Sequence, residues 1–208
     1  MREYYRHTRN LFQHSTSLMQ SFELEVVGDD TRRVPMMNFL ARQTTGEDFF
    51  DGFFSKNGLI YPENDQIFEE DPQRMMRFFL HSQRRHLRTS PEIRRLFKLN
   101  WDLVDGNFRR NRANRETWEE ILQNRGQVAH ILRRMHRVGF LGRYIPEFGK
   151  LTDLVQHEFF HRYSADEHTL RCIEVLDSLV HTEDPKLQHF RRSFQNMEDP
   201  VALYVALL

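Results

Sequence analysis

Apolar residues recur along most of this chain with the 3.6-residue spacing of an amphipathic α-helix. The clearest stripe lies in residues 71–86 and consists of Met75, Met76, Phe79 and Leu80. Asp71-Pro72 precedes this stripe and predicts an N-cap followed by proline at the first helical position. Ser90-Pro91 predicts the same kind of start for a second helix, so the pattern favours a helical fold.

Further helices are expected in the middle and at the end of the chain. Thr117 is the expected start of a third helix that stops near Gly126, and a fourth helix is expected to end at Gly139. The apolar positions of the fourth helix are Val128, Ile131, Leu132 and Met135. The same spacing returns at Ile173, Leu176, Leu179 and Val180, and again in the closing stretch DPVALYVALL.

One stretch, DGFFSKNGLIYP at residues 51–62, breaks the helical pattern. Asn57-Gly58 separates two short apolar runs, which is the strongest short-range signal for a β-hairpin. Two strands alone are marginally stable, so this hairpin is expected to lean on helices. We therefore predict an all-α fold, a multi-helix domain with one short β-hairpin near residues 52–61, and a boundary around residues 145–156.

The overall charge and composition narrow the function classes. Thirty basic and thirty acidic residues cancel, so no global field draws nucleic acid or an anionic membrane to the chain. No run approaches the ~20 apolar residues of a membrane span, and the polar start MREYY does not resemble a secretory signal. The single cysteine, Cys172, lies on an apolar helical face and is expected to be a buried, inert thiol, which fits a reducing cytoplasm.

The segment HEFFH matches the H-E-x-x-H pattern of zinc peptidases, in which two histidines on one helical face bind zinc beside a general-base glutamate. A zinc peptidase that uses His157, Glu158 and His161 is therefore one alternative function. The pattern does not continue as a metzincin requires, because Ser164 stands where a glycine is needed and Glu167 where the third histidine is needed.

The segment SADE, residues 164–167, also has the form of a capping box, with serine at the N-cap and glutamate at N3. It predicts the end of any helix that carries His157 and His161, and the start of a new helix with His168 in its first turn. A histidine at a helix start, with further ligands on the next helix, is an arrangement that suits a divalent metal in a helical phosphohydrolase.

The segment RGQVAHILRRMHRVGFLGRYIPEFGKLTDLVQHEFFHRYSADEHTLR, residues 125–171, resembles the central region of the bacterial PII uridylyltransferase/uridylyl-removing enzymes. A looser resemblance extends upstream to MREYYRHTRNLF and to DGFFSKNGLIYPENDQIFEEDPQRMMRFF. In that family a helical domain follows a nucleotidyltransferase domain and runs into an HD-type phosphohydrolase domain. The resemblance implies that residues 1–155 are the helical linker domain and that residues 156–208 are the N-terminal helices of a truncated HD-type domain.

The resemblance also implies a metal site and indicates what this chain lacks. The family's first HD-type metal ligand corresponds to His168, and His161 and His157 are further candidate ligands. The next family ligands form a His-Asp dipeptide, which this chain does not contain. The family's transferase chemistry needs a Gly-Ser turn and an Asp-x-Asp pair; the first is absent, and Asp29-Asp30 lacks the spacing of the second and is expected to form a turn.

These features predict a non-catalytic fragment of a larger enzyme, with no catalytic residue and no bound cofactor of its own, cut just before the HD motif. The resemblance implies that the parent enzyme uses UTP and Mg²⁺ or Mn²⁺ to transfer UMP to the PII signal protein, and that it also removes UMP, in nitrogen regulation. The apolar end VALYVALL is expected to be exposed by the truncation or to form a dimer contact.

Three clusters of arginine support another alternative. They are Arg84-Arg85-Arg88, Arg109-Arg110-Arg112-Arg115 and Arg133-Arg134-Arg137. Most of these side chains are expected on solvated faces, in ion pairs with Glu92, Glu116, Glu119 or Glu120. The alternative function is a free-standing helical adaptor that binds a protein or a nucleic acid through these clusters, with strongly salt-dependent binding in the second case.

Overall fold

A computed structural model describes residues 48–152, 154 and 164–208, together with residues 3, 6–8, 11 and 15. Its strands are β1 (Asp48–Phe50), β2 (Phe53–Lys56), β3 (Leu59–Pro62) and β4 (Arg88–Thr89). The α-helices from α2 onward are α2 (Ile67–Glu70), α3 (Arg74–Arg84), α4 (Pro91–Leu99), α5 (Gly106–Arg110), α6 (Arg112–Gln123), α7 (Val128–Arg137), α8 (Leu141–Tyr144), α9 (Pro146–Leu151), α10 (Ala165–Ser178), α11 (Gln188–Gln195) and α12 (Val201–Leu207). Short 3-10 turns occur at η3 (Trp101–Leu103) and η4 (Pro185–Leu187).

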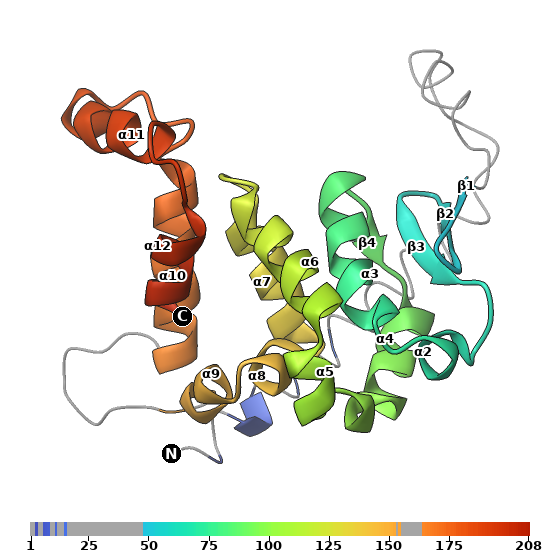
Figure 1. The fold of residues 1–208 in the computed structure, drawn as a ribbon. Helices are drawn as coiled ribbons and strands as arrows, with labels where there is room; N and C mark the ends of the chain where they lie inside the picture. The colour runs from blue at the N-terminus through green and yellow to red at the C-terminus, as the bar shows by residue number, and fades with distance from the viewer. Residues whose placement is uncertain are drawn as a thin grey trace.

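The predicted fold class is confirmed, because helices dominate the described residues and the strands form one small sheet (Figure 1). None of the described helices is both long enough and apolar enough to cross a membrane. The predicted domain boundary falls next to residues 155–163, which lie outside the described part of the chain, so the division into two domains stays a prediction.

The hairpin predicted at Asn57-Gly58 is present, with β2 antiparallel to β3. Asp51-Gly52 makes a second two-residue turn between β1 and β2, and φ is positive at both residues of both turns, as type I′ turns require. Strand β4 pairs with β3 in parallel, which gives the order β1-β2-β3-β4. The sheet is larger than the predicted hairpin because β1 and β4, of three and two residues, are too short to show a period of their own.

The hairpin leans on helices, as predicted, through a core of phenylalanine rings. Phe53 of β2 lies 5.7 Å from Phe78 of α3, measured between ring centroids. The next residue of α3, Phe79, lies 4.9 Å from Phe140, which precedes α8. All four rings are fully buried, and burying one phenylalanine side chain stabilises a fold by roughly 1.5–3 kcal/mol.

Capping residues explain why two central helices begin where they do. Ser90 caps α4 as predicted, since its Oγ accepts a hydrogen bond from the Ile93 N–H at 3.2 Å. The predicted helix start at Thr117 is wrong, because α6 begins at Arg112. The side chain of Asn111 accepts hydrogen bonds from the first backbone N–H groups of that helix and fixes its start five residues earlier than Thr117.

The predicted start of α3 at Asp71-Pro72 is also wrong, because the helix begins at Arg74. The Asp71 carboxylate accepts hydrogen bonds from two partners. One oxygen accepts the Gln73 N–H at 3.0 Å, and the other accepts a hydrogen bond from Arg77 at 2.8 Å. The segment therefore makes a tight turn before the helix begins.

The C-terminal helices α10, α11 and α12 lie together at the end of the molecule opposite the sheet (Figure 1). Helix α10 packs against α7, and α12 packs against both α10 and α6. Helix α7 ends as predicted just before Gly139, whose φ is 75°. In α12, Tyr204 is fully buried while Val205 is 51% exposed, so this apolar helix buries one face and exposes the other.

Candidate functional site

His168, the residue expected to bind a metal, lies in the first turn of α10 with an exposed side chain. The N-cap of this helix is Ser164, with extended backbone angles of φ −64° and ψ 158°. The helix therefore starts where the sequence predicts, but the hydrogen bonds of a capping box are absent, since the Ser164 side chain makes no cap hydrogen bond. The Glu167 carboxylate accepts hydrogen bonds from Arg133 of α7 instead of the backbone N–H at the start of its own helix.

His157 and His161, the other candidate metal ligands, lie outside the described residues, as does Glu158 of the zinc-peptidase pattern. The near neighbour of His168 is Cys172, whose Sγ lies 3.7 Å from His168 Nδ1. The prediction of a buried thiol is wrong, because Cys172 is half-exposed. It stands one turn after His168, off the face of α10 that buries Leu170, Ile173 and Asp177.

The residues that the structure describes do not complete a metal site around His168. No three His, Cys, Asp or Glu side chains among them come together in a group that could hold an ion. A stable zinc site takes three or four ligands in fixed geometry, and His168 with Cys172 supplies two. The role of His168 as a metal ligand therefore stays a prediction.

A row of polar contacts holds α10 along α7, and we call it the α7–α10 seam. At its centre, Arg133 of α7 binds Glu167 through two hydrogen bonds of 2.8 and 2.9 Å and also binds Glu174. The hydrogen bonds from Arg133 lower the pKa of Glu174. Because bidentate arginine–carboxylate contacts are directional, they fix the rotation and the height of α10 on α7.

One end of the seam joins the first turn of α10 to the last turn of α7. The Asp166 side chain is fully buried, and its Oδ2 lies 3.1 Å from His136 Nε2. The His136 ring also meets Phe148 of α9 edge-on, at 5.4 Å between ring centroids. Asp166 and Glu167 directly precede His168, so the position of His168 depends on both contacts.

The other end of the seam caps the N-terminus of α7 from a distance. Asp177 of α10 accepts hydrogen bonds from the Gly126 N–H at 3.1 Å and the Ala129 N–H at 2.7 Å. The local N-cap residue, Gln127, makes no side-chain cap. The Tyr204 hydroxyl of α12 donates to the same carboxylate at 2.5 Å, so three helices meet at one buried side chain.

Burial raises the pKa of Asp177, and the hydrogen bonds from Tyr204 and the backbone oppose that rise. Burial and the neighbouring carboxylate both raise the pKa of Tyr204. The phenol therefore stays protonated and remains a hydrogen-bond donor to Asp177 at neutral pH.

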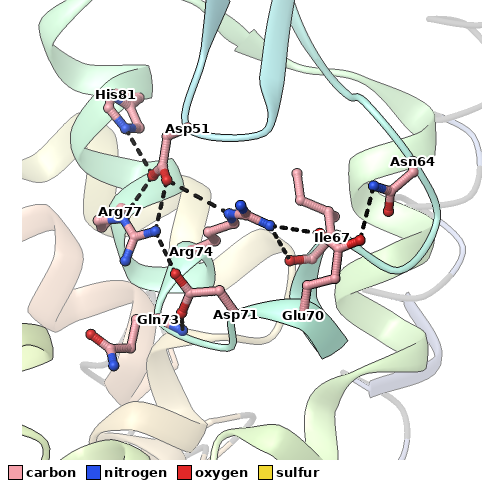
Figure 2. Close-up of polar contacts among 9 residues, drawn as sticks. All are labelled: Asp51, Asn64, Ile67, Glu70, Asp71, Gln73, Arg74, Arg77 and His81. Atoms are coloured by element: carbon pink, nitrogen blue, oxygen red, sulfur yellow. Dashed lines mark hydrogen bonds and ion pairs between the residues drawn. The ribbon is translucent and has the colours of Figure 1, made fainter.

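A second polar network lies at the sheet end of the molecule (Figure 2). Asp51, in the β1–β2 turn, accepts two hydrogen bonds of 2.7 Å from Arg77 of α3 and lies 3.2 Å from His81 Nε2. Arg74 approaches the same carboxylate at 3.6 Å, and Arg77 also binds Asp71. Burial raises the pKa of Asp51, but the hydrogen bonds and charges of Arg77 and His81 outweigh it and hold the pKa well below its usual range.

The arginine clusters have mixed roles in the structure. Two surface ion pairs are of the predicted kind, Arg84–Glu120 and Arg112–Glu116. Arg133 instead belongs to the α7–α10 seam, where only its contact with carboxylates 34 and 41 residues away determines its role. The sequence carries no local signal for that contact, nor for the cap that Asp177 provides.

Comparisons with known proteins show which proteins this chain is similar to. Residues 53–144, which run from β2 to the end of α8, match the family model described as the third domain of the uridylyltransferase GlnD. The bifunctional uridylyltransferase/uridylyl-removing enzyme of Pseudomonas fluorescens (strain SBW25) is 29% identical over 214 residues, covering 99% of this chain and 22% of that enzyme. No solved structure matches the chain.

Residues 53–144 are thus similar to a uridylyltransferase third domain, and the resemblance inferred from the sequence is confirmed. The chain spans about a fifth of the length of the relative it matches.

Proposed function

We propose that this chain is the non-catalytic helical scaffold of a cytoplasmic PII uridylyltransferase/uridylyl-removing enzyme. The observation that supports this proposal is the α7–α10 seam. Helix α7 lies inside the matched third domain, whereas α10 carries His168 after it. Arg133, His136 and the N-terminus of α7 contact three separate points of α10. These contacts would hold the two parts together as one body.

In the parent enzyme this body would hold the UTP-dependent transferase and the uridylyl-removing site at a fixed separation. Its substrate partner would be the PII signal protein, and Mg²⁺ or Mn²⁺ and UTP would bind to other parts of the enzyme. His168 would be the first of the HD-type ligands, with the remaining ligands supplied by residues beyond those described. The half-exposed helix α12 would meet further parts of the enzyme or a second copy of the chain.

The proposal predicts that the 208-residue chain alone neither transfers UMP to PII nor removes it. Without two positioned metal ions, nothing stabilises the attacking and leaving oxygens during UMP transfer. General acid–base help from a histidine such as His168 contributes only about 10²- to 10⁴-fold, far less than phosphodiester cleavage requires. The measurement is an assay of the purified chain with PII, UTP, glutamine and Mg²⁺ or Mn²⁺, run in both directions.

The assay needs one matched variant, His168→Ala, and controls washed with chelator. Turnover that survives the washing and disappears in His168→Ala would show that the chain is itself a catalyst and would overturn the scaffold proposal. Turnover that is equal in the variant and the parent chain would point to a contaminating enzyme, and repurification to constant specific activity would remove it.

A further inference from the structure

Basic side chains gather around the short strand β4, and we call them the basic cluster: His86, Arg88, Arg94, His130, Arg134 and Arg137. Arg134 of α7 donates hydrogen bonds to the Leu87 carbonyl and to Ser82 Oγ. Arg94 of α4 donates to the Thr89 carbonyl at 3.4 Å. The two guanidinium groups therefore reach the backbone on either side of Arg88, which lies in β4 itself.

The α7 members of the cluster share one face of their helix. His130, Arg134 and Arg137 are spaced by four and three residues, which places them side by side along α7. His130, Arg137 and the β4 residue Arg88 are exposed, and Arg134 lies deeper between them. The cluster thus has a half-buried cation at its base and exposed cations at its rim.

Burial and the neighbouring cations lower the pKa of three members of the basic cluster. Burial, and then the charges of Arg137 and Arg88, lower the pKa of Arg134 to about 10. Burial and the charges of Arg134 and Arg137 lower the pKa of His130. For Arg94, burial and Arg137 lower the pKa more than the nearby Glu92 raises it.

The neighbouring Arg133 is an arginine of the same helix whose charge is balanced by carboxylates. It lies between Glu167 and Glu174, and the hydrogen bonds that it donates to these carboxylates raise its pKa. In the described part of the chain, by contrast, no carboxylate forms a salt bridge with Arg88 or Arg134. Arg134 instead donates hydrogen bonds to the Ser82 hydroxyl and the Leu87 carbonyl. The like charges of Arg88 and Arg134 repel each other, which costs stability, and a bound anion would offset that cost.

We propose that the basic cluster binds a phosphate-type oxyanion, either free phosphate or pyrophosphate or the phosphate groups of a small nucleotide. The guanidinium fork matches phosphate oxygens in pairs. Arg134, oriented by Leu87 and Ser82, forms the floor of the site, and Arg88 and His130 close over the anion from β4 and α7. This site is independent of the scaffold proposal, because it uses none of the residues of the α7–α10 seam.

The test is isothermal titration of the purified chain with inorganic phosphate and with pyrophosphate, at constant ionic strength in chloride. We expect saturable binding of one anion to each chain, weakened about tenfold or more in Arg88→Gln and in His130→Gln, because each removes one hydrogen bond to a charged ligand. Both residues are exposed, so both variants keep the fold, and circular dichroism checks this. The matched control is Arg112→Gln, an exposed arginine that pairs with Glu116 away from the cluster.

Two results would overturn the site. One is the lack of saturable binding at about 10 mM pyrophosphate, where even a millimolar site would be mostly filled. The other is equal affinity in the parent chain, Arg88→Gln and His130→Gln, or equal weakening by Arg112→Gln.

Further titrations identify the source of the anion. A nucleoside triphosphate that binds more tightly than pyrophosphate, and still depends on Arg88, identifies a nucleotide as the ligand. A single-stranded oligonucleotide that binds more tightly than either small anion, with a steep salt dependence, would replace the small-anion site by a nucleic-acid surface.

Discussion

Asp51 holds a turn and two side chains of α3 at the same time. Its φ of 53° is left-handed, a conformation that asparagine also tolerates. The change Asp51→Asn therefore removes the charge without removing the turn. Because the Asp51 carboxylate accepts two hydrogen bonds from Arg77, we expect the variant to lose about 2 kcal/mol of unfolding free energy at pH 7.

The same residue makes stability depend on pH in a defined direction. The folded pKa of Asp51 lies below its ordinary value of 3.8, so its contribution is present above that pH and is lost as the pH falls toward the folded pKa. Urea unfolding at steps from about pH 5 to about pH 2 should show a shallower acid loss in Asp51→Asn than in the parent chain. Asp65→Asn, which removes an exposed ion pair with Arg95, is the control; an equal change in Asp65→Asn would contradict the assignment.

At the scale of an element, α7 depends for its start on a residue that is distant in sequence. Asp177→Asn keeps one oxygen acceptor but turns an amide N–H₂ toward backbone donors or toward Tyr204. We expect a loss of about 1–3 kcal/mol, because a buried donor is left without its partner. The measurement is the urea midpoint of unfolding at neutral pH.

The matched control for this change is Asp199→Asn. Asp199 accepts the Val201 N–H at 2.9 Å beside α12, at an exposed position where asparagine caps equally well. We expect that variant to unfold at the same urea concentration as the parent chain. A loss in Asp199→Asn as large as that in Asp177→Asn would mean that any aspartate cap matters equally and that burial adds nothing.

Elements were predictable where a local signal acts alone. Asn57-Gly58 fixes the β2–β3 turn because both residues adopt positive φ, and Ser90 fixes the start of α4 through its own hydroxyl. Predictions failed where two local signals compete. Asn111 precedes Thr117 and caps α6 first, and Asp71 is held by Arg77 in a turn.

At the scale of the whole molecule, the contacts that matter most join residues far apart in the chain. The capping-box sequence at residues 164–167 located the start of α10 and placed His168 in its first turn, but no sequence period reveals that Arg133 binds Glu167 or that Asp166 meets His136. From sequence alone, a charged side chain is predicted to lie on the surface unless the helix that covers it is known. For that reason the α7–α10 seam, and the basic cluster beside it, emerge only from the three-dimensional arrangement.

The seam predicts how the C-terminal helices loosen. Arg133→Ala removes two hydrogen-bonded contacts and leaves Glu167 and Glu174 as neighbouring carboxylates without their cation. We expect amide hydrogens of α10 to exchange about tenfold faster, with those of α4 unchanged, because opening of α10 becomes easier by roughly 1.4 kcal/mol. The control is Arg112→Ala, and an equally large rise in α4 would indicate general destabilisation and not loss of the seam.

Helix α7 is synthesised before the residue that caps its N-terminus. Asp177 follows Ala129 by 48 residues, and ribosomes add about 5–20 residues per second. For roughly two to ten seconds of synthesis, therefore, α7 has been made but its first backbone N–H groups still lack their carboxylate. During that interval, water or another acceptor must accept hydrogen bonds from those N–H groups. The first turn of α7 gains its capping carboxylate only after α10 has been synthesised.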